Sequence, residues 1–278
     1  MSKRSSREIV VSKNIGFCMG VKRAVELAEK SAGIYGEVYM LDALLHNKRE
    51  LERLKRAGVV SFKSAKGKAV IIPAHGATYE EKVELKKSFQ EVIDATCPIV
   101  TKNIKLIEKL KKEHYRIAIV GDRYHREVKV LKDAAGENLL GVFESKKDVK
   151  SISENAKVAV IAQTTITWEK LFEVSSELMK RSHELRIFNT ICTETIKRQI
   201  EACEMAKNVD CMIVIGGRTS ANTKRLYEKV KAVNKRTYFV ESGQDIEHFN
   251  ISTCKSIGII SGTSTPNWVI EEVIKGVR

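Results

Sequence analysis

Three cysteines of this chain share one local setting. Cys18, Cys97 and Cys192 each follow a short apolar run and each precede a segment with helical spacing. A thiol at the amino end of a helix sits in a positive field that lowers its pKa and favours the metal-binding thiolate. Three thiolates leave one position of a metal centre open, which is typical of a centre that binds substrate directly. Soft sulfur ligands favour an iron–sulfur cluster or zinc, and the cysteines alone leave both open.

Polar residues recur at a fixed distance from these cysteines. His46, His125 and Ser220 each lie 28 residues after one of them, in the loop after the next apolar run. The histidines are candidates for anion binding, and Ser220 with Asn222 before a helix is a candidate phosphate cradle or a simple N-cap. A third apolar run in each stretch again ends in a polar loop, which contains His75, or Thr164 with Thr165, or Ser264 with Thr265.

Glu127 follows His125 closely and is a carboxylate near this constellation. We therefore regard it as the natural candidate for a proton donor. The simpler interpretation is an acidic residue in the first turn of a helix, where it favours the helix dipole.

The elements that must position these residues alternate along the chain. Short Val- and Ile-rich runs alternate with longer amphipathic segments, which predicts an α/β fold with mostly parallel sheets. In such sheets ligands bind beyond the carboxyl ends of the strands, which is where the candidate residues fall. The predicted strands are 8–12, 37–41, 68–74, 91–95, 116–121, 157–163, 185–189, 211–217 and 256–262.

The repeated cysteine context divides the chain into three pseudo-repeated small α/β units around a central site. Their expected ranges are 18–96, 97–191 and 192–278. The first two units end with the strand that delivers the next cysteine, whereas the third ends in a helix. The N-terminal strand 8–12 is left over, so we predict that it completes the third sheet.

The formal net charge of +14 indicates anionic partners. Residues 1–96, 97–191 and 192–278 carry net charges of +6, +5 and +3, without a basic tail, so solvated helix faces explain most of the excess. With 6% aromatic residues there are few side chains for base stacking, and we expect no nucleic-acid partner.

Apolar runs in the chain are strand-sized, below the ~20 residues that span a bilayer, and the N-terminus lacks an apolar leader core. We therefore expect a soluble, cytoplasmic protein without a membrane partner. All six cysteines are expected to be reduced. Cys203, Cys211 and Cys254 are interpreted as small buried hydrophobic residues.

Taken together, these motifs make the chain resemble the LytB/IspH family of 4-hydroxy-3-methylbut-2-enyl diphosphate reductases. The matching segments run in family order from residue 14 to residue 266: NIGFCMGVKRAVE, LLHN, AHG, DATCP, GDRYHREV, QTT, NTICTETIKRQ, SANT and SGTSTP. Each segment alone is weak evidence for the family. The complete set is highly specific for it and covers nearly the whole chain.

The resemblance implies a site as well as a fold. It implies one [4Fe-4S] cluster held by Cys18, Cys97 and Cys192, with an open apical iron that binds the substrate hydroxyl. Glu127 matches the family's proton donor, and the resemblance also makes His125 and Thr165 catalytic candidates. The implied substrate-binding residues are His46, His75, His125, Thr165, Thr195, Ser220, Asn222 and Ser264.

The implied reaction is the two-electron reductive dehydroxylation of (E)-4-hydroxy-3-methylbut-2-enyl diphosphate to isopentenyl and dimethylallyl diphosphate. This is the last step of the non-mevalonate pathway, with an electron donor such as ferredoxin or flavodoxin. The chain departs from the family pattern at two places, which affect the detail of the pocket. Ala221 stands where the family often has serine, and GDRYH stands where the family often has a Gly-His-rich loop.

Two other classes of protein are alternatives to the reductase. A zinc hydrolase or deaminase would use the same thiolates with a bound water and would be colourless. A basic nucleic-acid-binding protein would show steeply salt-dependent affinity, but it leaves the threefold cysteine pattern unexplained.

Overall fold

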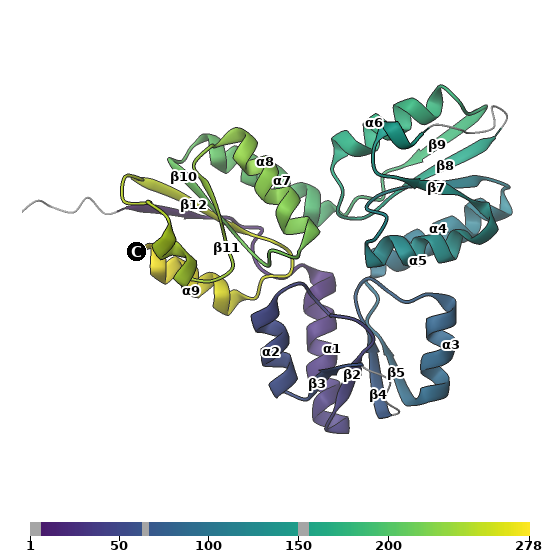
Figure 1. The fold of residues 1–278 in the computed structure, drawn as a ribbon, viewed down its shortest axis with the longest axis horizontal. Helices are drawn as coiled ribbons and strands as arrows, with labels where there is room; N and C mark the ends of the chain where they lie inside the picture. The colour runs from purple at the N-terminus through teal and green to yellow at the C-terminus, as the bar shows by residue number, and fades with distance from the viewer. Residues whose placement is uncertain (1–6, 63–66, 150–155) are drawn as a thin grey trace, which may run out of the picture. The chain divides into compact units, whose positions relative to one another are not determined.

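Three four-stranded parallel sheets form the framework of the chain (Figure 1). This computed structural model describes residues 7–62, 67–149 and 156–278. Contacts divide the chain into two compact units. Unit 1 comprises residues 1–22, 45–56 and 193–278, and unit 2 comprises residues 23–44 and 57–192. The division falls within helix α1 (Met19–Tyr35), and each unit is described by itself.

Unit 1 contains one sheet with helices on both of its faces. Its strand order is β1 (Glu8–Val11), β12 (Ser256–Ser261), β10 (Cys211–Ile215) and β11 (Thr237–Val240). One face packs against α7 (Thr193–Lys207) and α8 (Ala221–Val233). The other packs against α9 (Asn267–Val277) and the short η3 helix (Gln244–His248). Helix α2 (Lys48–Arg56) also belongs to this unit.

Unit 2 contains the other two sheets. One has the order β3 (Val59–Ser61), β2 (Val38–Met40), β4 (Gly67–Ile72) and β5 (Phe89–Asp94), followed in sequence by α4 (Pro98–Lys112). The other has the order β7 (Leu139–Phe143), β6 (Arg116–Val120), β8 (Lys157–Ala162) and β9 (Glu184–Phe188). The remaining helices are α3 (Tyr79–Ser88), α5 (Arg126–Ala135), α6 (Trp168–Met179), η1 (Gly136–Asn138) and η2 (Lys146–Asp148).

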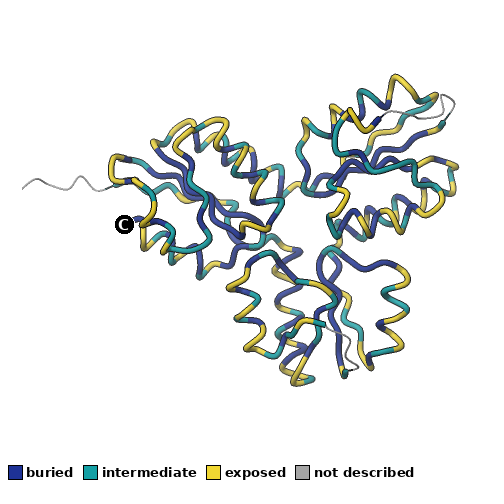
Figure 2. The backbone as a smooth tube through the Cα atoms, in the orientation of Figure 1, coloured by how far each residue is buried: buried dark blue, intermediate teal, exposed yellow. Residues whose placement is uncertain are grey.

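The central strands are buried along nearly their whole length, as the dark blue segments in Figure 2 show. Every side chain of β10 is buried, and five of the six in β8 are buried. Because helices cover both faces of a parallel sheet, its inner strands are apolar without alternation. The predicted α/β class with mostly parallel sheets is confirmed, while the three domain ranges stay a prediction.

All three sheets share one connectivity. In each, one edge strand is followed in sequence by one of the three cysteines: β1 by Cys18, β5 by Cys97 and β9 by Cys192. For the sheet of unit 1, this strand comes from the N-terminus, and Glu8–Val11 pair with residues 256–259 of β12. The same relation between strand and cysteine therefore occurs in every sheet.

Sequence analysis missed the opposite edge strand of each sheet: β3, β7 and β11. These strands have three to five residues and partly exposed side chains, so they lack the continuous apolar run that marks the inner strands. Among the described residues, no helix has the length and apolar composition that a membrane span requires.

The expectation that all six cysteines are reduced is wrong for one pair. Cys211 and Cys254 form a disulfide, with their Cα atoms 6.0 Å apart. The pairing follows from the sheet, because Cys211 is in register with Ile257 on the neighbouring strand and Cys254 lies just before that strand. Both residues are buried in the core of unit 1, as predicted. Cys203, by contrast, is a reduced, half-buried thiol within α7.

Candidate functional site

Each of the three candidate ligand cysteines is held by an equivalent backbone hydrogen bond. Every one follows an edge strand and directly precedes or caps a helix: α1, α4 or α7. The amide N–H donates to the carbonyl oxygen two residues past the end of the adjacent strand. The three bonds are Cys18 to Thr263 at 3.1 Å, Cys97 to Ala74 at 2.9 Å and Cys192 to Thr164 at 2.8 Å.

This bond also brings each cysteine next to a predicted substrate residue. The residue after each accepting carbonyl is Ser264, His75 or Thr165. All three side chains are half-buried, as are the three cysteines. The backbone of each sheet therefore joins one candidate metal ligand to one candidate substrate-binding residue, without using either side chain.

Cys97 and Cys192 both belong to unit 2 and interact electrostatically. Burial raises the pKa of the Cys97 thiol, although the backbone N–H groups of Ile99 and Val100 at the start of α4 act to lower it. The neighbouring Cys192 and Glu127 raise it further. The predicted lowering of the thiol pKa is therefore wrong for Cys97, because burial and nearby negative charge outweigh the helix terminus.

Glu127 is buried in unit 2, with 1% of its surface exposed. It lies in the first turn of α5, and its carboxylate binds the loop after β8. One oxygen accepts the Thr164 amide N–H at 2.7 Å and the other accepts the Thr164 hydroxyl, also at 2.7 Å. Such bonds offset the cost of burying a carboxylate. Thr164 had no predicted role, although its position directly before Thr165, in the polar loop after a predicted strand, was a usable signal.

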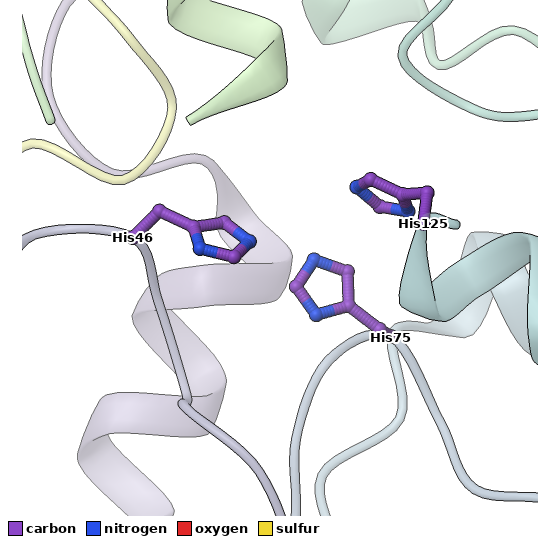
Figure 3. Close-up of side chains that lie close together, drawn as sticks. All are labelled: His46, His75 and His125. Carbon is purple, nitrogen blue, oxygen red and sulfur yellow. The ribbon is translucent and has the colours of Figure 1, made fainter. Parts of the chain in front are cut away.

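His75 and His125 lie together in unit 2. Their rings meet edge to face with centroids 5.2 Å apart, and Figure 3 shows His125 at the start of a helix and His75 on a loop. The Nδ1 atom of His125 accepts the Glu127 amide N–H at 3.2 Å, so His125 caps α5. With Nδ1 used as an acceptor, a neutral His125 carries its proton on Nε2, which can donate to an anion.

Thr165 is held by the side chain of Gln163, whose amide donates to the threonine hydroxyl at 3.1 Å. The carbonyl oxygen of the same Gln163 side chain accepts the Asp122 amide N–H at 2.9 Å. Gln163 therefore ties the loop after β8 to the loop that leads to His125. It is fully buried, and sequence analysis did not assign it a role.

His46, also drawn in Figure 3, belongs to unit 1 and precedes α2. A glycine is required beside it, because a Cβ atom at Gly217 would lie 2.0 Å from the His46 carbonyl oxygen. The next residue, Asn47, is buried and its side-chain oxygen accepts the Glu50 amide N–H at 3.0 Å. The backbone of His46 is therefore packed closely against the loop after β10.

Ser220 and Asn222 also belong to unit 1. The Ser220 hydroxyl is buried and caps α8 by accepting the Thr223 amide N–H at 3.2 Å. The Asn222 amide donates to the Thr263 hydroxyl at 3.0 Å, and the carbonyl of Thr263 is the partner of Cys18. Asn222 thus contacts the loop after β12 through Thr263, whereas Ser220 bonds to Thr223 within its own helix, and Ala221 leaves both bonds intact.

Thr195 is buried in the first turn of α7, one turn before a buried arginine. Arg198 donates to the carbonyl oxygens of Gly16 at 2.9 Å and Ser261 at 2.8 Å. It holds the loop that leads to Cys18 against the end of β12. Sequence analysis did not identify Arg198, because a single arginine in a helical segment carries no distinguishing pattern.

An ion-pair network supports the first turn of α5. Glu81 caps α3 by accepting the Thr78 amide N–H at 2.8 Å and forms ion pairs with Arg126, at 2.5 Å, and Lys129, at 2.8 Å. Arg126 lies between His125 and Glu127 in the sequence. Burial acts to raise the pKa of Glu81, but these partners hold it at about 2.

Within unit 2 the structure therefore groups Cys97, Cys192, His75, His125, Glu127 and Thr165 on the loops after β4 and β8 and at or just before the starts of α4, α5 and α7. Within unit 1 it joins Cys18 and Asn222 to the loop that carries Ser264, and Ser220 caps the helix that carries Asn222. Buried polar groups, histidines and thiols at helix amino ends form a setting for a soft metal centre and an anion.

Comparison with known proteins places this geometry in a family. A family model described as LytB protein matches residues 9–278. The chain is 40% identical to 4-hydroxy-3-methylbut-2-enyl diphosphate reductase of Citrifermentans bemidjiense over 272 residues, which cover 96% of this chain and 95% of the relative. It is 39% identical to the protein of that name from Geobacter sulfurreducens over 274 residues, covering 98% and 97% of the two chains.

Solved structures agree with the fold. A structure described as (E)-4-hydroxy-3-methyl-but-2-enyl diphosphate reductase, the terminal enzyme of the non-mevalonate pathway, matches with a TM-score of 0.74 and 37% identity, covering 98% of this chain and 99% of that one. The reductase structure from Plasmodium falciparum has a TM-score of 0.89 at 24% identity, covering 97% and 87%. The latter supports the fold alone.

Replacing Glu81 with glutamine tests the support of α5. A carboxyl group whose pKa is held at about 2 stabilises the fold above the unfolded value of 4.5 and loses that effect as the pH falls toward 2. We expect Glu81→Gln to lower the free energy of unfolding at pH 7, by at most about 3 kcal/mol at 1.36 kcal/mol per pKa unit. The difference from wild type should shrink below pH 4.5, as measured by urea titration. If the difference in unfolding free energy did not change with pH, the stabilising role assigned to the charged Glu81 carboxylate would be wrong.

Proposed function

The chain belongs to the LytB protein family, and on that premise we propose that it is a 4-hydroxy-3-methylbut-2-enyl diphosphate reductase. The observation that carries the proposal is the buried Glu127 beside Cys97 and Cys192, with both of its oxygens bound by Thr164. A carboxyl group beside two thiols supports the proposal, because a reductive removal of a hydroxyl group needs a proton donor close to a redox centre.

The proposed reaction breaks the carbon–oxygen bond of the substrate's allylic alcohol. Two electrons and two protons are consumed: one proton joins the leaving oxygen, which departs as water, and the other joins carbon. Protonation at either end of the allyl group yields isopentenyl or dimethylallyl diphosphate. An electron donor such as ferredoxin or flavodoxin supplies the electrons.

The donor set fits an iron–sulfur group. Cys192 lies close enough to Cys97 to raise the pKa of the Cys97 thiol, an effect that a bound positive metal ion would offset. Cys18 occupies the equivalent backbone position in unit 1, with its amide bound to Thr263. We propose that the three cysteines hold one [4Fe-4S] cluster with an open apical iron. When bound, this group would supply electrons and a Lewis-acid position for the hydroxyl oxygen.

Glu127 is proposed to deliver the proton to the leaving oxygen. Its carboxylate is buried, so a transferred proton is not exchanged directly with solvent. The Thr164 hydroxyl can both accept and donate, so it can stay bonded to the carboxyl group in either protonation state. Thr165, fixed by Gln163, is proposed to contact the substrate hydroxyl.

The diphosphate is proposed to bind neutral donors rather than the chain's many lysines. His125 presents Nε2 and lies against His75, and the start of α8 contributes Ser220 and Asn222. Helix amino ends and histidine N–H groups are suited to phosphate oxygens. His46, Thr195 and Ser264 complete the proposed set of substrate-binding residues.

The direct test is anaerobic conversion of the hydroxy-diphosphate by the purified protein with dithionite and methyl viologen. We expect formation of both isopentenyl and dimethylallyl diphosphate, with visible absorption and with iron and sulfide bound to the protein. A colourless protein that contains zinc but neither iron nor sulfide, and that forms neither product, would exclude the reductase.

Glu127→Gln tests the proton donor. The amide keeps the size of the side chain but has no acidic proton, so we expect turnover to fall about 10²- to 10⁴-fold. Iron content and diphosphate binding should stay near wild type. Glu137→Gln, an exposed change nearby in sequence, is the control. Turnover of Glu127→Gln within a few-fold of the control would remove Glu127 from this role.

Cys97→Ser tests the ligand set against Cys203→Ser. Both thiols are reduced and half-buried, but Cys203 lies well inside α7. Because a serine hydroxyl is a harder and far less acidic ligand than a thiol, we expect Cys97→Ser to lose most bound iron after anaerobic reconstitution. Cys203→Ser should retain the visible spectrum and iron content of wild type. Equal iron content in the two variants would refute the assignment.

A further inference from the structure

A groove of about 580 Å³ lies beside the start of α4 in unit 2. Its lining includes Pro98, the residue directly after Cys97, and Thr96, directly before it. Three basic side chains, from Arg23, Lys102 and Lys105, also line it. The groove is therefore positively charged and borders the backbone on both sides of a proposed cluster ligand.

The positive charge of the groove is not cancelled by the acidic residue in its lining. The carboxylate of Asp94 pairs with Lys82 at 3.1 Å and accepts the Thr96 amide N–H at 2.9 Å. Burial acts to raise the pKa of Asp94, but these hydrogen bonds lower it overall, so the group is charged and already paired. Arg23 donates to the main-chain carbonyls of Thr96 and Asp94, which carry no net charge.

A row of lysines extends the groove along α4. Lys102, Lys105, Lys109 and Lys112 are all exposed and are spaced three or four residues apart, so they share one face of the helix. Pro98 lies on the same face of α4, four residues before Lys102. Lys109 forms a long, exposed ion pair with Glu113, at 3.8 Å, which is weak in water. The row thus presents a basic surface that begins at Cys97.

We propose that this surface, Pro98 with the four lysines and Arg23, is the docking site of an acidic protein that carries one electron at a time. The proposal rests on the proposed function, which consumes two electrons per substrate. Two successive carriers, each oxidised by one electron, supply them through the cluster bound at Cys97.

The physical reason is steering by charge. Electron-transfer complexes bury small interfaces, and opposite charge on the two partners raises their association rate and sets their orientation. A partner with acidic side chains around its redox group would meet the lysine row with that group next to Cys97. Because the charges are exposed, the interaction must weaken strongly as salt is added.

The test compares two double variants with equal change in charge. Lys102→Glu/Lys105→Glu reverses the groove, and Lys86→Glu/Lys87→Glu reverses two exposed lysines at the end of α3. Binding of an oxidised bacterial flavodoxin to the cluster-loaded protein is measured by calorimetry at low and high salt. We expect the Kd to rise about tenfold or more in the groove variant at low salt, and to change little in the α3 variant.

Turnover adds a second measurement. With reduced flavodoxin as donor, the groove variant should need about tenfold more donor for half-maximal rate. With dithionite and methyl viologen as donor, its rate should equal that of wild type.

Three outcomes would overturn the docking site: no flavodoxin binding by wild type, equal Kd in the two variants, or equal loss of turnover with both kinds of reductant. The last would mean that the groove acts on the substrate site itself. Failure of the proposed function looks different. In that case wild type would bind flavodoxin in the charge-dependent manner described but would not convert the hydroxy-diphosphate with dithionite.

Discussion

A backbone hydrogen bond that occurs three times organises this molecule. In each sheet, the amide of a cysteine at the end of an edge strand donates to a carbonyl just past the neighbouring strand, with distances of 2.8–3.1 Å. The bond ties the segment after the edge strand to the loop after its neighbouring strand. It uses neither the cysteine side chain nor the side chain of the residue after the carbonyl. A proposed metal ligand and a proposed substrate contact are therefore positioned by the same two strands.

Hydrogen bonds of buried polar side chains then hold the candidate site residues on this framework. Glu127 and Gln163 are buried, yet each is hydrogen-bonded to the backbone and to a threonine hydroxyl. Arg198 similarly binds two backbone carbonyls near Cys18. Buried polar groups with such partners are rigid, because breaking any one bond leaves a desolvated group unsatisfied. The site is thus held by its surroundings before any ligand binds.

Sequence alone predicted the inner strands and the strands that deliver the cysteines, because each is a short apolar run next to a recognisable helix. It could not predict β3, β7 and β11, whose few, partly exposed residues are specified by pairing with a neighbour rather than by their own pattern. The positions of Cys18, Cys97 and Cys192 at strand ends were predictable from local context.

Contacts between distant residues were not predictable. The Cys211–Cys254 disulfide depends on the register of β10 against β12, and the Glu81–Arg126 pair joins two helices that are separate in sequence. The raised pKa of Cys97 depends on burial and on two charged neighbours from other segments. Sequence patterns report the local preference for helix or strand, whereas these features arise only after the segments have packed.

The use of the N-terminal strand to complete the sheet of the C-terminal segment imposes an order of assembly during synthesis. β1 leaves the ribosome first, but it pairs with β12, and Gly16 bonds to Ser261 across 245 residues of sequence. Segments in unit 2 contain all strands of their own sheets and can fold as they emerge. Cys18 is therefore the first of the three cysteines to be made and the last to reach its folded setting. The proposed cluster needs all three cysteines, so its insertion would have to wait until the chain is nearly complete.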